Sequence, residues 1–321
     1  MTTVSKLLTR NSQTLSMGLA ILATLSLAYP AIARSQDQGS RQIVLDEFTR
    51  ARPATPAAVK PRTKARKPVA SVRPKAPRYT LKTPSLIADL KPGSPTMDIG
   101  VTIWRLRPSA GNDGGARVLV MENTQSSQWT PHRIEADTSL KVGERVRITI
   151  ESPRAGYLYV IDREQYADGS LGDAYLIFPT LRTRGGDNRV RPGKLIDIPA
   201  QEDNPSYFTL VPSPNRSDQV AEIRTILVTP EPFEDLQLGN NPVKLSKSDV
   251  ANWERTWSSQ VERFEMEGGA GKAWTSMEKE ASSASSARVL THEEPAPQTI
   301  DRIASKSKNA FMVTVPLRYG R

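Results

Sequence analysis

The stretch RVRITIESPRAGYLYVI, residues 145–161, contains two hydrophobic patterns that decide the fold class. Apolar and polar side chains alternate strictly over 145–150, which predicts a β-strand with one dry and one wet face. The run 157–161 is continuously apolar, as expected of a central strand covered on both faces. Turn-forming residues lie between the two runs, so we expect the two strands to pair as a hairpin.

Similar short apolar runs, separated by turn residues, occur throughout 97–232. About eight strands in roughly 130 residues predict a mainly β domain, either an antiparallel β-sandwich or a distorted barrel. The further runs are 99–103, 118–120, 174–178, 195–198, 207–211 and 223–228.

Five motifs follow one another in this region: Val142–Arg147, Ala155–Ile161, Leu176–Pro179, Asn188–Lys194 and Ile198–Pro199. Their order resembles that of the bacterial domain-of-unknown-function family 4384, over about residues 97–230. The resemblance implies a compact β domain in exported or signalling-associated bacterial proteins, sometimes beside kinase-like or caspase-like modules. It implies no established activity.

Residues 1–33 have the three parts of a secretory signal peptide. Lys6 and Arg10 precede the apolar run 17–28, and Ala31-Ile32-Ala33 offers small residues for cleavage after Ala33. The apolar run is about 12 residues long, whereas a helix needs roughly 20 to span a bilayer. We therefore expect an exported protein, periplasmic or extracellular, with no transmembrane helix in the mature chain.

The net charge of +10 comes mainly from one segment of the chain. Residues 50–82 contain 11 basic residues, six prolines and no acidic residue, whereas 83–321 carry a net charge of −2. We expect 34–96 to be a disordered linker rich in Pro, Ala, Lys and Arg. Its basic part, 50–82, is predicted to bind envelope polyanions or another envelope protein, or to act only as a solvated spacer. Export and a nearly neutral domain argue against nucleic acid as a partner.

Residues 233–321 are predicted to form a helical extension, a loose segment and a final strand. An S-x-x-D capping pattern at 246–249 begins the helix, which Gly268-Gly269 ends. Within it an aromatic and apolar stripe at helical spacing packs on the β domain, or else fills a partner's groove. The stripe consists of Trp253, Trp257, Val261 and Phe264.

The rest of this region contains weaker signals. Residues 281–287 are rich in Ser and Ala, and 295–297 read Pro-Ala-Pro, so both are predicted to be loose. The run 311–315 is predicted to be the last strand, and an edge strand because Pro316 follows it.

Several chemistries have no support in the sequence. The chain has no Cys, which excludes disulfides, thiolate metal sites and cysteine nucleophiles. His132 and His292 lack metal-site spacing and a triad context, so no metal site and no serine hydrolase is predicted. Gly268–Lys272 resembles a phosphate loop superficially, but Met266 replaces its first glycine and Ala273 its Ser/Thr; we interpret it as a helix C-cap and a turn. No cofactor is predicted.

Two loops hold candidate site residues. Four acids on the connection 162–173 are suited to bind calcium or to supply a carboxylate pair for glycoside hydrolysis, the alternative being turn-forming and solubilising roles. Five cations on 182–194 are suited to bind phosphate or sulfate, the alternative being a solvated hairpin. The acids are Asp162, Glu164, Asp168 and Asp173, and the cations are Arg182, Arg184, Arg189, Arg191 and Lys194.

These features together predict an exported, non-enzymatic binding or scaffold protein of the cell envelope, with a β-sandwich module on a basic stalk. The alternative is a carboxylate-dependent hydrolase acting on envelope glycans, which depends on the loop acids alone. Two carboxylates about 5 to 10 Å apart in a cleft would support the hydrolase, whereas acids spread over a convex turn would not.

Overall fold

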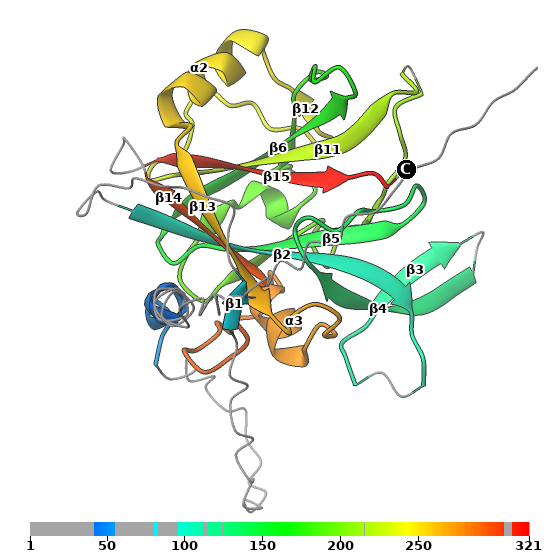
Figure 1. The fold of residues 1–321 in the computed structure, drawn as a ribbon, viewed down its shortest axis with the longest axis vertical. Coiled ribbons are helices and arrows are strands. Elements are labelled where there is room, and N and C mark those ends of the chain that lie inside the picture. Colours follow the sequence, from blue (N-terminus) through cyan, green and yellow to red (C-terminus); the bar gives the residue numbers. More distant parts are fainter. Residues whose placement is uncertain are drawn as a thin grey trace, which may run out of the picture.

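The computed structural model describes residues 42–54, 80–82, 96–111, 114–122, 125–214, 216–304 and 310–320. Two antiparallel sheets pack face to face, and the helix α2 (Lys247–Trp257) lies on the outside of one of them (Figure 1). The fold is thus a β-sandwich, which confirms the mainly β class predicted from the sequence. The expected signal peptide and most of the expected linker lie outside the described residues.

The larger sheet, sheet one, is built around the long strand β2 (Thr96–Pro108). One edge of β2 pairs with β5 (Arg145–Glu151), and the other pairs first with β14 (Thr299–Ala304) and then with β4 (Gln125–Ile134). The other strands of this sheet are β1 (Thr80–Lys82), β3 (Val118–Glu122), β9 (Leu195–Ile198), β10 (Phe208–Thr209) and β13 (Gln260–Glu267).

The smaller sheet, sheet two, has β6 (Gly156–Tyr166) and β11 (Gln219–Thr229) at its centre. Next to β11, β15 (Phe311–Arg318) is the end strand of the sheet, in agreement with the predicted last edge strand. The other strands are β7 (Tyr175–Phe178), β8 (Arg189–Val190) and β12 (Val243–Lys244).

The strand β6 is covered on both faces, as its apolar run predicted. Leu158 and Val160 belong to the core between the two sheets. Tyr159 and Ile161 point the other way, into a second apolar cluster that includes Val250 of α2. A continuous apolar run therefore serves two separate cores.

The predicted hairpin between 145–151 and 156–166 is wrong. β5 belongs to sheet one and β6 to sheet two, so the short turn between them crosses from one sheet to the other. Both edges of β5 already pair with other strands, β2 on one side and β9 and β10 on the other. No edge of β5 is left for β6.

The prediction of a wet face on β5 is also wrong. Arg147, Thr149 and Glu151 are 1%, 4% and 2% exposed. Two segments cover this side of sheet one: residues 42–54, which were expected to be disordered linker, and residues 270–298. We call these two segments the outer layer of sheet one.

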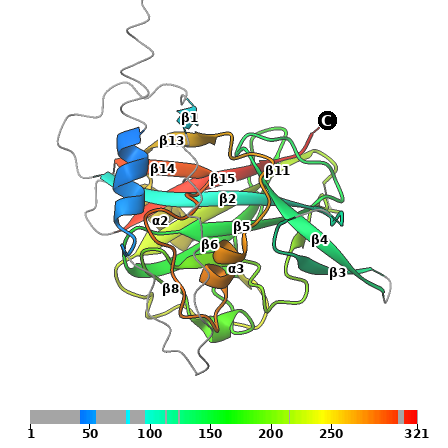
Figure 2. The same cartoon turned by 90° about the horizontal axis from the view of Figure 1, so that it is seen from below.

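Residues 42–50 are helical and bury an apolar face against sheet one (Figure 2). Val44, Leu45 and Phe48 pack with Phe264 of β13 and Ile300 of β14. The sequence pattern did not indicate this helix, because the basic, proline-rich stretch that follows it directly favoured disorder for the whole segment.

The boundary expected at 232 does not divide this fold. β13 and β14 extend sheet one and β15 extends sheet two, so the last third of the chain completes both sheets. The predicted helix ends at Trp257, because Arg263–Glu267 alternates polar and apolar side chains and forms the strand β13 instead. Gly268–Lys272 is accordingly a turn after a strand and not a helix C-cap.

The segments expected to be loose have defined positions in the fold, and each is buried in part. The helix α3 (Ser276–Ser282) reaches into 281–287 and begins with a capping box between Thr275 and Glu278. Ala296 is 5% exposed, and its carbonyl oxygen accepts a hydrogen bond from Arg133 at 2.7 Å. Both segments belong to the outer layer of sheet one.

Candidate functional site

At one end of the sandwich, the inner face of sheet two changes from apolar to polar. The face that carries Leu158 and Val160 of β6 continues with Asp162, Glu164 and Tyr166. In the strand register, Arg224 of β11 lies opposite Asp162, and Glu222 opposite Glu164. Two carboxylates therefore face each other directly on neighbouring strands, an arrangement that like charges disfavour.

These side chains open into a cavity of about 480 Å³, which we call the carboxylate cavity. Carboxylates, cations and tyrosines all contribute to its lining, so the cavity contains both hydrogen-bond donors and acceptors. Its lining includes Asp162, Glu164, Asp173, Glu222, Arg163, Arg216, Lys247, Tyr166 and Tyr175. Cavities of this size accommodate small ligands.

Glu222 is the carboxyl group that this environment perturbs most clearly. Burial raises the pKa of Glu222 above its usual value, and the nearby charge of Glu164 raises it further. Its carboxylate accepts hydrogen bonds from Gln219 at 2.9 Å and from the Tyr319 hydroxyl at 3.1 Å. Burial also raises the pKa of Tyr319, so this hydroxyl keeps its proton.

Glu164 has one hydroxyl partner of its own. The Tyr166 hydroxyl donates a hydrogen bond to it, which raises the pKa of Tyr166. The guanidinium of Arg216 stacks on the Tyr166 ring, 3.6 Å from its centroid, and holds the ring in place. A side chain at Gly172 would be tightly packed, because its Cβ would lie 3.1 Å from a carboxylate oxygen of Glu164.

Three of the four lining carboxylates have cationic partners, and Arg224 contacts two of them, since its Nη1 also lies 3.4 Å from a carboxylate oxygen of Glu222. Asp162 pairs with the buried Arg224, whose pKa burial lowers to about 10. Asp173 accepts a hydrogen bond from Lys244 at 2.5 Å, which lowers the pKa of this carboxyl group. Asp173 is therefore held ionised, whereas Glu222 holds its proton to higher pH than usual.

Of the four predicted loop acids, three line this cavity and one does not. Asp162 and Glu164 lie within β6 and not on a loop, because the strand runs to Tyr166. Asp168 lies on the turn that follows, where the hydroxyl and the backbone N–H of Ser170 donate hydrogen bonds to it and lower its pKa. Within the described part of the chain, no three His, Cys, Asp or Glu side chains are grouped closely enough to hold a metal ion.

Of the five predicted cations, Arg184 and Arg191 lie close enough to Lys194 for their charges to lower its pKa. Lys194 is 5% exposed and donates hydrogen bonds to the carbonyl oxygens of Ser283 and Ser286 at 2.7 and 2.8 Å, so it anchors the segment after α3. Arg189 is paired with Asp187 at 2.8 Å. Arg182 and Arg191 are exposed, and Arg184 is half-buried. The prediction is wrong for Lys194, because the backbone takes up its ammonium group.

The aromatic stripe is divided between two sheets. Trp253 and Trp257 of α2 stack with Phe233 on the outside of sheet two, as expected for residues that pack on the β domain. Phe264 lies in β13 and packs under the helix 42–50 on the other sheet. The prediction that it shares their helix face is wrong.

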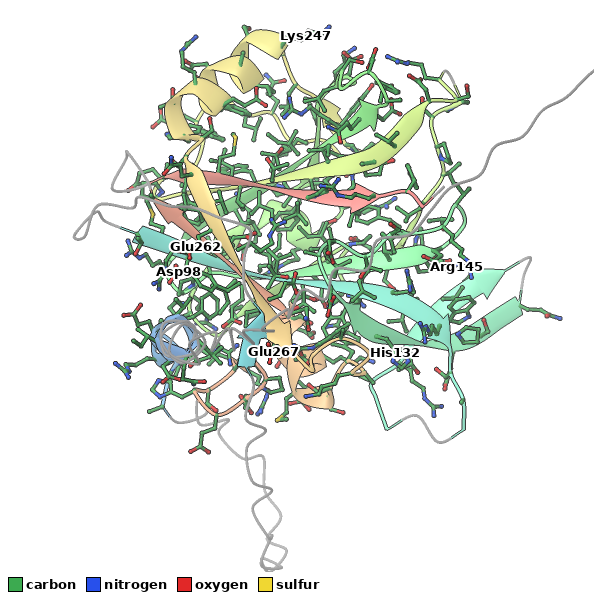
Figure 3. The ribbon with its side chains drawn as sticks, viewed as in Figure 1. Asp98, His132, Arg145, Lys247, Glu262 and Glu267 are labelled. Atoms are coloured by element: carbon green, nitrogen blue, oxygen red, sulfur yellow. The ribbon has the colours of Figure 1, made fainter. Side chains whose placement is uncertain are left out.

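Each of the two histidines interacts with a backbone carbonyl group that is distant from it in the sequence. Nδ1 of His132 lies 3.1 Å from the carbonyl oxygen of Gly271, and His292 contacts that of Arg52. In Figure 3, His132 lies on the lower side of the sandwich, remote from Lys247 at the start of α2, which borders the carboxylate cavity.

The sequence reasoning missed Glu222 and Arg216, which are essential parts of the cavity. The signal in the sequence was Arg224, a charged residue inside the apolar strand 223–228, because a buried charge needs a partner.

Comparisons with family models, with curated proteins and with solved structures found no match. No helix in the described segments is long and apolar enough to cross a membrane.

Proposed function

We propose that this chain is an exported, non-enzymatic binding protein of the cell envelope, and that it binds a polyhydroxylated ligand, such as an envelope glycan, in the carboxylate cavity. The observation that carries this proposal is that Glu164, Glu222, Arg216 and Tyr166 line one cavity. A sugar hydroxyl both donates and accepts hydrogen bonds, so it matches a lining that contains both donors and acceptors. The exposed Tyr175 at the rim adds an aromatic surface for a sugar ring.

A titration of the full chain with an N-acetylglucosamine trisaccharide tests this proposal. We expect saturable binding by calorimetry, and at least tenfold weaker binding for Glu222→Gln and for Glu164→Gln. The matched control is Glu234→Gln, an exposed glutamate outside the cavity lining, which should bind like the wild type. Equal affinity in all four proteins, or no binding to the wild type, would overturn the proposal.

Hydrolysis of the same class of ligand is the second candidate, and the Glu164–Glu222 pair favours it. A carboxyl group that keeps its proton to higher pH, facing a second carboxyl group, is an arrangement that glycoside hydrolysis uses. Burial and the charge of Glu164 both raise the pKa of Glu222, which suits it to act as the acid. Release of shorter sugars from the trisaccharide, lost in Glu222→Gln, would identify an enzyme; an intact trisaccharide would leave the binding protein.

The basic linker contributes the second half of the proposal, attachment to envelope polyanions. Of the 11 basic residues in 50–82, Arg52 is not available to polyanions, because its side chain is buried in an ion pair with Glu151. Co-sedimentation with anionic vesicles should therefore depend on residues 55–82 and should weaken with salt. Equal, salt-insensitive recovery of the chain with and without 55–79 would contradict attachment through the linker.

A further inference from the structure

A second cavity, of about 410 Å³, lies on the opposite sheet and shares no lining residue with the carboxylate cavity. We call it the Trp274 cavity. Its walls come from β3, the loop after β9, the helix α3 and the strand β5. Its lining includes Arg117, Leu119, Met121, Arg147, Gln201, Asp203, Trp274 and Lys279.

The deepest wall of this cavity carries buried hydrogen-bond donors without acceptors. Arg147 is 1% exposed, and its Nη2 donates to Asp197 at 2.8 Å. Its Nε and Nη1, and the Nε1 of Trp274, find no partner among the described residues. An unpaired donor in the interior is costly, and one on a cation more so.

Among the charged residues that line the cavity, cations outnumber carboxylates, while Asp197 and Glu202 act on Arg147 from outside the lining. The guanidinium carbon of Arg147 lies 4.6 Å from the centroid of the Trp274 ring, and the ammonium nitrogen of Lys279 lies 5.8 Å from it. Arg117 adds a third cation, against the single carboxylate of Asp203 in the lining. Thr183 and the backbone N–H of Ala200 already donate hydrogen bonds to Asp203. Burial lowers the pKa of Arg147, whereas the charges of Asp197, Glu202 and Asp203 raise it.

The outer wall of the cavity is apolar and open to solvent. Leu119 and Met121 of β3 are 62% and 52% exposed, among the most exposed large apolar side chains of the described residues. β3 is the end strand of sheet one, and Figure 1 shows it projecting from the body of the sandwich. Apolar side chains that line a cavity in this way offer a surface to an apolar part of a ligand.

From these observations we infer that the Trp274 cavity binds a carboxylate attached to a short apolar chain. The carboxylate accepts hydrogen bonds from the unpaired donors of Arg147 and Trp274, with Lys279 and Arg117 adding positive charge. The apolar chain lies against Leu119 and Met121. This site is independent of the proposed glycan site, because the two cavities lie on different sheets.

A titration of the full chain with hexanoate tests this assignment, with acetate and 1-hexanol as controls. Hexanoate has both the charge and the chain, acetate lacks the chain and hexanol lacks the charge. We expect saturable binding of hexanoate, at least tenfold tighter than either control, and weaker in high salt. Equal binding of hexanol and hexanoate, or no binding of hexanoate, would overturn the inference.

Two variants locate the site without disturbing the fold. Leu119→Glu places a negative charge at an exposed position of the cavity wall, and we expect it to weaken hexanoate binding at least tenfold. Val142→Glu makes a similar change at a residue that is 60% exposed and lines a different cavity, and it should bind like the wild type. Unchanged binding in Leu119→Glu, or equal losses in both variants, would contradict the assignment.

A further arm identifies the source of the carboxylate. N-acetyl-leucine carries the carboxylate of a peptide end beside an apolar side chain, whereas hexanoate represents a fatty acid. Tighter binding of N-acetyl-leucine would indicate a peptide carboxyl terminus, and tighter binding of hexanoate a lipid-derived acid. Both results support the site, provided that Leu119→Glu weakens them.

Discussion

The two outer faces of this sandwich are covered by different kinds of contact. On sheet two, α2 and the segment before it form an aromatic stack, in which the ring of Phe233 lies 4.5 Å from that of Tyr159 and 4.9 Å from that of Trp253. On sheet one, the outer layer buries three pairs of an arginine and a carboxylate. They are Arg52–Glu151, Arg133–Glu278 and Arg147–Asp197.

We call the covering of sheet two the aromatic layer and the outer layer of sheet one the charged layer. Aromatic contacts themselves need no hydrogen bonds, and on this side of sheet two the buried Nε of Arg163 has no hydrogen-bond partner among the described residues. A buried ion pair needs every donor satisfied, and Arg147 leaves two of its nitrogens without a partner. A ligand can therefore satisfy more unpaired donors beneath the charged layer than beneath the aromatic layer.

The largest expected effect comes from breaking one pair in the charged layer. Arg52 donates two hydrogen bonds to Glu151, at 2.6 and 2.7 Å, and both side chains are buried. Glu151→Ala leaves the guanidinium without its counter-charge, so we expect the free energy of unfolding to fall by about 3–5 kcal/mol. Urea denaturation measures this loss.

The double variant separates the pair from its surroundings. Arg52 also donates to the carbonyl oxygens of Thr291, Glu294 and Pro295, so Arg52→Met is itself destabilising. We expect Arg52→Met/Glu151→Ala to lose less than the sum of the two single losses, because the side chains are coupled. If the loss of the double variant equals the sum of the two single losses, the ion pair does not stabilise the contact between the outer layer and sheet one.

A substitution in the aromatic layer should lower the free energy of unfolding by less, and this loss should not depend on salt concentration. Phe233→Ala removes the ring that contacts Tyr159, Trp253 and Trp257, and we expect a loss of about 2–3 kcal/mol, since the site is partly exposed. Denaturation at low and high salt should give the same loss. Val211→Ala, at a residue 62% exposed, is the control and should change stability very little. A strongly salt-dependent loss at Phe233 would remove the contrast between the two layers.

The sequence predicted the burial of β6, beneath the aromatic layer, better than the burial of β5, beneath the charged layer. The apolar run 157–161 indicated a strand with two buried faces, and β6 has them, because hydrophobic pattern and burial depend on the same side chains. The polar face of β5 was read as wet, because Arg and Thr at alternate positions are usually solvated. Its burial depends on Arg52, 99 residues away, and on segments beyond 270, which no local pattern reveals.

The carboxylate cavity was predicted in part for a similar reason. Asp162, Glu164 and Asp173 were named because they are close together in the sequence. Glu222 was missed because its position opposite Glu164 follows from the register between β6 and β11, which only the folded sheet defines. The alternation in Arg263–Glu267 was readable as a strand, but the preceding tryptophans favoured a longer helix.

The charged layer should make stability depend on pH in the alkaline range. Burial lowers the pKa of Lys194 to about 8 from 10.5, so between these values the unfolded chain binds a proton that the folded chain has released. Stability should therefore rise as pH increases from about 8 to 10.5, by about 2 kcal/mol, and this rise should be absent in Lys194→Met. Denaturation of both proteins across this pH range measures it. A rise of the same size in the variant would exclude Lys194 as its cause.

The smallest expected effect concerns the charged contact at the rim of the aromatic layer. Glu254 of α2 pairs with Arg163 of β6, and its side chain is 39% exposed, so water screens the pair. We expect Glu254→Gln to lower the free energy of unfolding by about 0.5 kcal/mol at low salt, and by less at high salt. Denaturation of Glu254→Gln and of Glu151→Ala under identical conditions compares an exposed ion pair with a buried one. A loss at Glu254 as large as that at Glu151 would mean that charge also holds α2 on sheet two, because aromatic packing alone would then be insufficient.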